Sequence, residues 1–212
     1  MHGADNAPDE TRRRLVRTII AAPVVLAAPS LLGLQACART AEAGIPLDPT
    51  PACDDGDDDP TESQTEGPYF KRSSPERTSL VERGLAGTPL VLAGRVVTRS
   101  CRLVSGALLD FWQADDSGAY DNVGFRLRGH QFTNAQGIYS LETIVPGLYP
   151  GRTPHIHVKV QAPNRPVLTT QLYFPGESRN AGDGIYDPDL LMQLASAADG
   201  REGRFTFVLD IP

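Results

Sequence analysis

The chain has 212 residues, of which 40% are hydrophobic, and it carries a formal charge of −6 at pH 7. This length allows one domain with a full hydrophobic core and leaves too little for two. The excess of acidic residues argues against nucleic acid as a partner, because binding it requires a basic surface.

An export signal is expected over residues 1–36. The basic run Thr11–Arg17 precedes an apolar stretch, residues 18–34, that contains two prolines. This pattern is typical of a twin-arginine signal, and it predicts a periplasmic, extracellular or cell-surface location. A membrane-spanning helix is the alternative, although about 17 residues with two prolines is short for a span.

The three cysteines bear on processing and redox state. The residues Leu34–Cys37 resemble a lipoprotein box, in which Cys37 would carry a lipid and form the only link to a membrane, whereas Ala36 also suits ordinary signal peptidase. Cys53 and Cys101 are then an even pair in an oxidising compartment, and we expect a disulfide between them. Two free thiols remain the alternative, since the sequence gives no geometry.

Residues 37–61 are expected to form a tether. This stretch is rich in Pro, Ala, Thr and Asp, and it includes the acidic run Asp54–Asp59. Such a composition cannot bury enough apolar surface to fold. The folded domain is therefore expected over residues 62–212, with no prediction of its oligomeric state.

Apolar and polar residues alternate along six segments of this domain, and turn residues separate the segments. The pattern predicts an all-β fold, a β-sandwich of mainly antiparallel strands with at most one or two short helices. One helix is expected to begin at Asp187 as N-cap with Pro188 at its first position, to carry three leucines, and to end at Gly200. The expected strands are Leu90–Val97, Ala107–Gln113, Ile138–Val145, His155–Ala162, Val167–Phe174 and Arg204–Ile211.

The run from Pro146 to His157 is the most informative part of the domain. It contains two Pro-Gly turns, Tyr149, and a strand that opens His-Ile-His. Because strand side chains alternate between faces, His155 and His157 point to one side, and the apolar residues between and after them point to the other. Two imidazoles therefore face one site.

A metal site at this position would need oxygen ligands. Beyond the expected signal the chain has three histidines, His130, His155 and His157, and no cysteine cluster for structural zinc. Tyr149 and Tyr120 both follow glycine-containing turns at strand ends. Phenolate is a hard anionic donor that suits Fe(III), with histidine as the nitrogen donor. The residues alone leave ordinary packing roles open for all of these side chains.

The motifs together resemble the intradiol ring-cleavage dioxygenase family, which includes protocatechuate and catechol dioxygenases. The most specific match is Tyr149–Arg152 followed by His155–His157. The other matching segments, in family order, are Gln64–Phe70, Trp112–Tyr120, Arg126–Gly129 with Gly137, and Thr170–Pro175. The resemblance covers about residues 61–212.

By position, the resemblance implies that Tyr120, Tyr149, His155 and His157 bind Fe(III). Tyr149 would be the axial phenolate that leaves when a catechol-type substrate arrives, and it would then serve as a base. Arg152 would be the cation beside the bound ring, with Gln171 as a polar group near the substrate. The implied reaction opens the ring with O2 between its two hydroxyl-bearing carbons.

Two departures from the family concern the access to this site. Well-known members have a longer insertion between the axial tyrosine and the first histidine, whereas only Pro150–Pro154 intervene here, and the acidic tether cannot replace the helical dimerisation domain of catechol dioxygenases. We therefore expect a more open site. Two alternatives use fewer of these residues: a non-catalytic module like the carboxypeptidase-regulatory domains, and a periplasmic copper- or zinc-binding protein.

Overall fold

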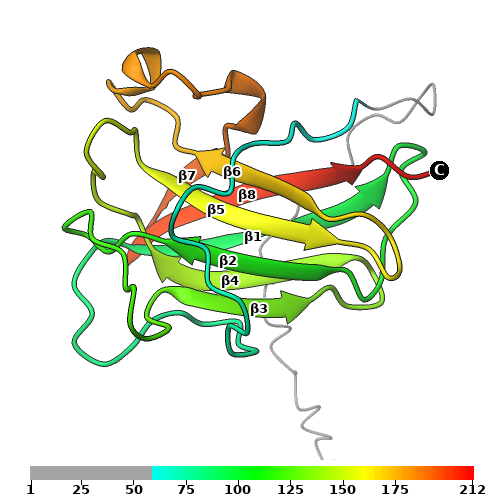
Figure 1. Cartoon of the computed structure of the whole chain (residues 1–212), viewed down its shortest axis with the longest axis horizontal. Coiled ribbons are helices and arrows are strands. Elements are labelled where there is room, and N and C mark those ends of the chain that lie inside the picture. The colour runs from blue at the N-terminus through cyan, green and yellow to red at the C-terminus, as the bar shows by residue number, and fades with distance from the viewer. Residues whose placement is uncertain (1–58) are drawn as a thin grey trace, which may run out of the picture. The chain divides into compact units, whose positions relative to one another are not determined.

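The domain is built from two four-stranded sheets that pack face to face (Figure 1). The computed structural model describes residues 59–212, which belong to one compact unit. One sheet has the strand order β4-β1-β8-β7 and the other β3-β2-β5-β6. All neighbouring strands are antiparallel except β1 and β8, which are parallel. The expected β-sandwich is confirmed.

Six of the eight strands correspond to the predicted segments, and two strands were not predicted. The bounds of the second sheet are β2 Leu108–Gln113, β3 Arg128–Phe132, β5 His155–Gln161 and β6 Leu168–Tyr173. Those of the first are β1 Pro89–Thr98, β4 Ile138–Ile144, β7 Gln193–Ala197 and β8 Gly200–Leu209. The strands missing from the prediction are β3 and β7.

The core lies between the sheets and follows the predicted alternation. Leu109 and Phe111 of β2 are fully buried there, as are Ile156, Val158 and Val160 of β5. The residues between them point to the outer face of their sheet. Burial of these side chains thus fixes which residues β5 presents on the outside, because a shift of one residue would move the apolar row out of the core.

The predicted helix from Asp187 to Gly200 is wrong. Asp187 does cap a turn, since its carboxylate accepts from the Asp189 amide at 3.0 Å, but the 3₁₀ turn η2 spans only Pro188–Leu190. Leu191 is already extended, with φ −71° and ψ 127°. Residues 193–197 instead pair with β8, where backbone hydrogen bonds are available along the whole strand. A second 3₁₀ turn, η1, spans Asn180–Gly182.

A segment without regular structure, residues 62–74, crosses the outer face of the second sheet (Figure 1). The Gln64 amide donates to Thr169 O at 2.8 Å, and Phe70 packs on Trp112 with ring centroids 4.9 Å apart. Thr61, just before it, is joined to Val208 of β8 at 2.9 Å. This segment buries polar side chains that the sheet alone would leave on its surface.

Cys101 lies in the loop between β1 and β2 and is disulfide-bonded. Its expected partner, Cys53, is outside the described residues, so the pairing stays a prediction. The expected export signal, residues 1–36, and the lipid site at Cys37 also lie outside them, as does nearly all of the tether over residues 37–61. Among the described residues, none forms a helix with the length and hydrophobicity that a bilayer crossing needs.

Candidate metal centre

The two histidines lie side by side on the outer face of β5, with ring centroids 4.7 Å apart. Strand pairing places His157 opposite Trp112 of β2 and Gln171 of β6. The Trp112 ring stacks on the His157 ring at 4.8 Å and 6°. Each imidazole is therefore held by a rigid strand, and His157 is further held by an aromatic neighbour.

The backbones of the two loops that carry Tyr120 and Tyr149 lie in direct contact. A side chain at Gly118 would lie 2.1 Å from Leu148 O, and one at Gly147 would lie 2.2 Å from Asp116 O. The Gly147 amide also donates to Asp115 O at 2.8 Å. Only glycine permits this approach. The glycines in the two tyrosine-bearing turns thus bring Tyr120 and Tyr149 to the same place.

Three polar atoms converge between these elements. The His155 Nε2 atom lies 3.1 Å from His157 Nε2 and 3.2 Å from the Tyr120 hydroxyl. Two donor atoms that are each about 2 Å from one ion are separated by roughly 3 Å when their bonds are near a right angle. The spacing of the three atoms therefore suits coordination of a single cation.

Tyr149 completes the group at its edge. Its ring contacts Tyr120 at 5.8 Å, and its hydroxyl is hydrogen-bonded to that of Tyr69 at 2.8 Å. Tyr69 in turn stacks on Tyr120 at 4.4 Å and 13°. No described hydrogen bond joins Tyr149 to either histidine. Tyr149 is the least constrained of the four candidate ligands.

A buried arginine ties the Tyr69 and Tyr120 segments together. Arg128 is 1% exposed, and its guanidinium donates to Tyr69 O at 2.5 Å and to Asp121 O at 3.0 Å. These two carbonyls belong to different parts of the chain, one before β1 and one after β2. Because Arg128 donates to both carbonyls, it holds the two segments together and so supports the stacking of Tyr69 on Tyr120.

Both histidines are neutral in the metal-free protein. Burial lowers the pKa of His155 to about 4, and burial together with the neighbouring His155 and Arg152 lowers the pKa of His157 well below its usual value. His155 Nδ1 lies 2.7 Å from Thr153 O, a carbonyl that can only accept. The proton is therefore on Nδ1, and the Nε2 lone pair points into the site, as metal ligation requires.

Burial raises the pKa of Tyr120, although the positive charges of Arg152 and Arg128 oppose this effect. Its hydroxyl therefore keeps its proton until a stronger positive charge is next to it. A bound cation would supply that charge and convert the phenol into a phenolate ligand. The donor set thus consists of two imidazole nitrogens and tyrosine oxygens.

Arg152 and Gln171 lie together beside this group. Arg152 Nη2 donates to Gln171 Oε1 at 2.7 Å, and Gln171 Nε2 donates to Thr65 O at 3.0 Å. Arg152 Nε donates to Asp183 at 2.8 Å. Burial alone would raise the pKa of Asp183, but hydrogen bonds from Thr153, Ile185 and Arg152 bring it below the usual value. Asp183 is therefore an anion that matches the Arg152 cation.

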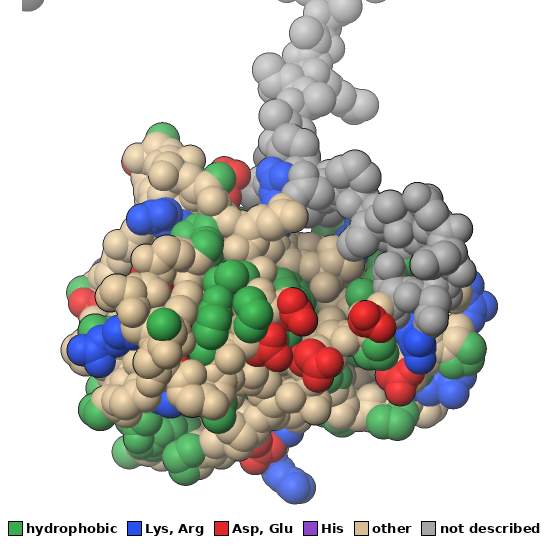
Figure 2. All heavy atoms as spheres, turned by 90° about the horizontal axis from the view of Figure 1, so that it is seen from above, with side chains coloured by type: hydrophobic (Ala, Val, Ile, Leu, Met, Phe, Trp, Pro, Cys, Tyr) green, Lys and Arg blue, Asp and Glu red, His purple; other side chains and the backbone are tan. Residues whose placement is uncertain are grey.

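The candidate ligands differ in their exposure. His155 and His157 are 4% and 3% exposed, and Tyr120 and Tyr149 are half-buried. On the face drawn in Figure 2, no described histidine side chain reaches the surface. The described residues contain no group of three or more His, Cys, Asp or Glu that could hold a metal. Any metal here would therefore depend on tyrosine oxygen.

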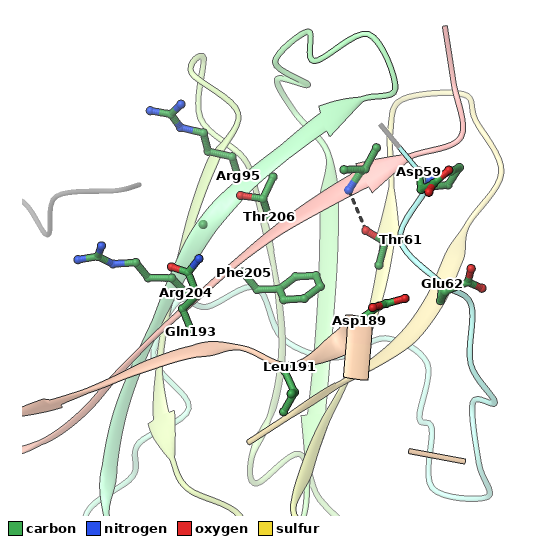
Figure 3. Close-up of a pocket in the computed structure, with 13 residues that line it drawn as sticks. Asp59, Thr61, Glu62, Arg95, Asp189, Leu191, Gln193, Arg204, Phe205 and Thr206 are labelled. Carbon is green, nitrogen blue, oxygen red and sulfur yellow. Dashed lines mark hydrogen bonds between the residues drawn. The ribbon is translucent and has the colours of Figure 1, made fainter. Parts of the chain in front are cut away.

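A separate cavity of about 690 Å³ lies on the outer face of the first sheet. Figure 3 shows Arg95 and Arg204 on one side of it, Asp59 and Asp189 on the other, and Phe205 between them. Its lining includes neither histidine nor tyrosine. It is therefore not a second candidate for the metal centre.

The structure adds three residues to the site that the sequence did not single out. Tyr69 belongs to a segment that matched the family, but nothing in that segment assigned it a contact. Thr153 acts through its backbone carbonyl, and Asp183 comes from a loop 31 residues after Arg152. His130, the remaining histidine of the domain, lies elsewhere on the sheet, where its Nδ1 is 3.1 Å from the Ser74 hydroxyl.

Comparison with known proteins identifies the family. The family model described as Dioxygenase matches residues 65–211, which includes every residue of the candidate site. The chain belongs to the intradiol ring-cleavage dioxygenases. The family match removes the alternative of a carboxypeptidase-regulatory-like module.

Solved members of the intradiol family share the fold. The dioxygenase domain of a dioxygenase and carbohydrate-binding protein fusion from Streptomyces sp. SirexAA-E is 64% identical, with a TM-score of 0.71 over 73% of this chain and 100% of that domain. An intradiol ring-cleavage dioxygenase from Tetranychus urticae is 25% identical, with a TM-score of 0.66 over 72% of this chain and 94% of that one.

A curated relative, hydroxyquinol 1,2-dioxygenase from Nocardioides simplex, is 30% identical over 152 residues, or 60% of this chain and 52% of the relative. This chain spans about half the length of the curated relatives that it matches. These relatives are dioxygenases, a class of oxidoreductases.

Proposed function

We propose that this protein is a non-haem Fe(III)-dependent dioxygenase that opens catechol-type rings between the two hydroxyl-bearing carbons and gives muconate-type diacids. The observation that carries the proposal is that His157 Nε2 and the Tyr120 hydroxyl both lie within 3.2 Å of His155 Nε2, with Tyr149 beside them. Two histidine nitrogens and two tyrosine oxygens suit a hard, highly charged ion such as Fe(III).

The four side chains Tyr120, Tyr149, His155 and His157 would hold the iron. When bound, Fe(III) draws electron density from a chelated catechol and so opens a ring carbon to attack by O2. The chain supplies the geometry. The Thr153 carbonyl fixes the tautomer of His155, and the Trp112 ring fixes the plane of His157.

Tyr149 is suited to accept a proton from the substrate. A catechol must lose its hydroxyl protons to bind a metal, and a tyrosine oxygen beside the candidate site would be a base at the right place. Tyr149 is half-buried, and its hydroxyl already has a partner in Tyr69 at 2.8 Å. Tyr69 can keep this hydrogen bond to Tyr149 as the Tyr149 oxygen gains the proton.

Arg152 is suited to meet negative charge on the ring. It is a fixed cation whose guanidinium is held by Gln171 and Asp183. A preorganised positive charge stabilises charge that develops during the reaction, because it needs no reorganisation at that moment. Gln171 is 0% exposed, and it serves chiefly to hold this guanidinium.

Turnover tests the proposed function. The matched relatives are named for hydroxyquinol, chlorocatechol and catechol, so the iron-loaded protein should be assayed with these rings and with protocatechuate. We expect equal amounts of O2 and ring to be consumed and a colourless muconate-type diacid to form. A yellow semialdehyde would show cleavage outside the two hydroxyls. Colourless protein that binds stoichiometric copper or zinc in an iron-replete host, without turnover, would favour the metal-binding alternative.

We also propose export by the twin-arginine route and a disulfide between Cys53 and Cys101. The basic run Thr11–Arg17 supports export, and the disulfide at Cys101 supports an oxidising compartment. Closing a loop of about 50 residues would stabilise the fold by ~4 kcal/mol. Peptide mapping of the unreduced, exported protein should recover Cys53 linked to Cys101. Recovery of Cys53 as a free thiol would reject the pairing.

A further inference from the structure

Asp183 is buried beside the candidate site, although it belongs to none of the segments that match the family by motif. Its side chain is 2% exposed. One carboxylate oxygen accepts from Arg152 Nε at 2.8 Å and from the Thr153 amide at 3.0 Å, and the other accepts from the Ile185 amide at 3.1 Å. A buried carboxylate is tolerated only with such partners. These three donors therefore fix the position of the carboxylate.

The hydrogen bonds of the Arg152 guanidinium leave one nitrogen, Nη1, with its two N–H groups for a ligand. Nε is taken by Asp183, and Nη2 by Gln171 Oε1 at 2.7 Å, with the Tyr173 hydroxyl at 3.4 Å. No described residue accepts from Nη1. Because the guanidinium is planar, the bonds at Nε and Nη2 fix its plane. Nη1 therefore has a set direction and no partner among the described residues.

We propose that Asp183 is the positioning residue that aims the Arg152 guanidinium, and through it Nη1, at the negative charge of the bound ring. This role rests on the proposed function of Arg152. Gln171 and Tyr173 could not supply it without Asp183, because both contact the guanidinium at Nη2, and contacts at that one nitrogen would leave the group free to turn.

The same carboxylate also braces the turn that leads into β5. Asp183 accepts from the Thr153 amide, and Thr153 O accepts from His155 Nδ1 at 2.7 Å. Asn180 holds the same turn independently, since its side-chain oxygen accepts from the Thr153 hydroxyl at 2.7 Å and its amide donates to Phe174 O at 3.0 Å. The loop that contains Asn180 and Asp183 therefore holds Thr153 through both residues, but only Asp183 also contacts Arg152.

The first test needs no metal and no turnover. Asp183→Ala removes both carboxylate oxygens, whereas an asparagine could still accept from Arg152 Nε through its amide oxygen. In the metal-free protein we expect the Arg152 Nε–H signal in NMR spectra to be protected from solvent exchange and to lose that protection in Asp183→Ala. An unchanged Arg152 signal would overturn the positioning role, whatever the activity of the protein.

The second test uses the iron-loaded enzyme with catechol. Asp183→Ala should keep its iron, and its kcat should fall by between about tenfold and hundredfold, the scale expected for a misplaced catalytic group. In the Arg152→Ala background the same change should cost less than about twofold, because residues that act as a unit are not additive. Full additivity in the double variant would contradict the proposal.

Asn180→Ala is the matched control. It removes two hydrogen bonds from the same loop and leaves the contact between Asp183 and Arg152 in place, so kcat should stay near that of the wild type. Equal losses in Asn180→Ala and Asp183→Ala would mean that loop stability, and not the orientation of Arg152, sets the rate. If the wild-type enzyme opens no catechol, the proposed function fails, while the NMR test still decides whether Asp183 orients Arg152.

Discussion

Replacing His157 with alanine is expected to remove iron, colour and activity together. The His157 Nε2 atom lies 3.1 Å from His155 Nε2, which is also 3.2 Å from the Tyr120 hydroxyl. The remaining histidine of the described residues, His130, contacts Ser74 instead. The His157 ring is stacked on Trp112 and is 3% exposed, so it is held in place and we assign it no role other than metal binding. Metal analysis after dialysis, with the visible spectrum and oxygen uptake of the same sample, measures all three losses.

His130→Ala is the matched control for this change. His130 lies on a strand of the same sheet, and it contacts Ser74 rather than the tyrosines. It should keep iron, colour and turnover. Because His157→Ala also leaves a gap beside Trp112, thermal unfolding should show that both variants remain folded. A folded His157→Ala protein that keeps its iron and its colour would remove His157 from the metal centre.

Replacing Arg152 with alanine should have a different effect, because its proposed task is to meet charge on the ring and not to hold metal. The variant should keep its iron and its colour, and its spectrum should still change when catechol is added. Turnover should fall by on the order of a hundredfold, the scale of losing one group that stabilises transition-state charge. Single-turnover kinetics with catechol separates this loss from weaker binding.

Arg165→Ala controls for the loss of one positive charge, because Arg165 is exposed in the loop between β5 and β6. Its turnover should stay near that of the wild type. If Arg152→Ala loses iron as severely as His157→Ala, then Arg152 holds the loop between Tyr149 and His155 in place. The charge-stabilising role proposed for Arg152 would then be wrong.

The strands could be predicted wherever burial imposed an alternating pattern. The segment His155–Ala162 is an example, since its apolar residues alternate with the residues that form the site. The strand β3 was missed because its sequence, Arg-Gly-His-Gln-Phe, carries little apolar signal, and its Arg128 is buried for hydrogen bonding. Leu190, Leu191 and Leu194 have the spacing of a helix, and only the pairing of residues 193–197 with β8 decides for a strand.

The candidate site divides in a similar way. Strand alternation alone placed His155 and His157 on one face, and the need for oxygen ligands pointed to Tyr120 and Tyr149. The resemblance to the family gave these four residues their roles and added Arg152 and Gln171. Gly118 contacts Leu148 O because two loops far apart in the sequence meet in space, and a local sequence pattern cannot predict such a contact. Asp183 reaches Arg152 across 31 residues from a loop with no motif of its own. Such long-range contacts required the structure.

The visible spectrum of the iron-loaded protein, recorded with its metal content, tests most directly whether tyrosines and histidines form one Fe(III) centre here. Phenolate bound to Fe(III) absorbs visible light through charge transfer, so a protein with stoichiometric iron should be red-brown, and catechol should change the spectrum. Folded protein that contains stoichiometric Fe(III) and is colourless would mean that neither Tyr120 nor Tyr149 binds the metal, and it would contradict the proposed centre.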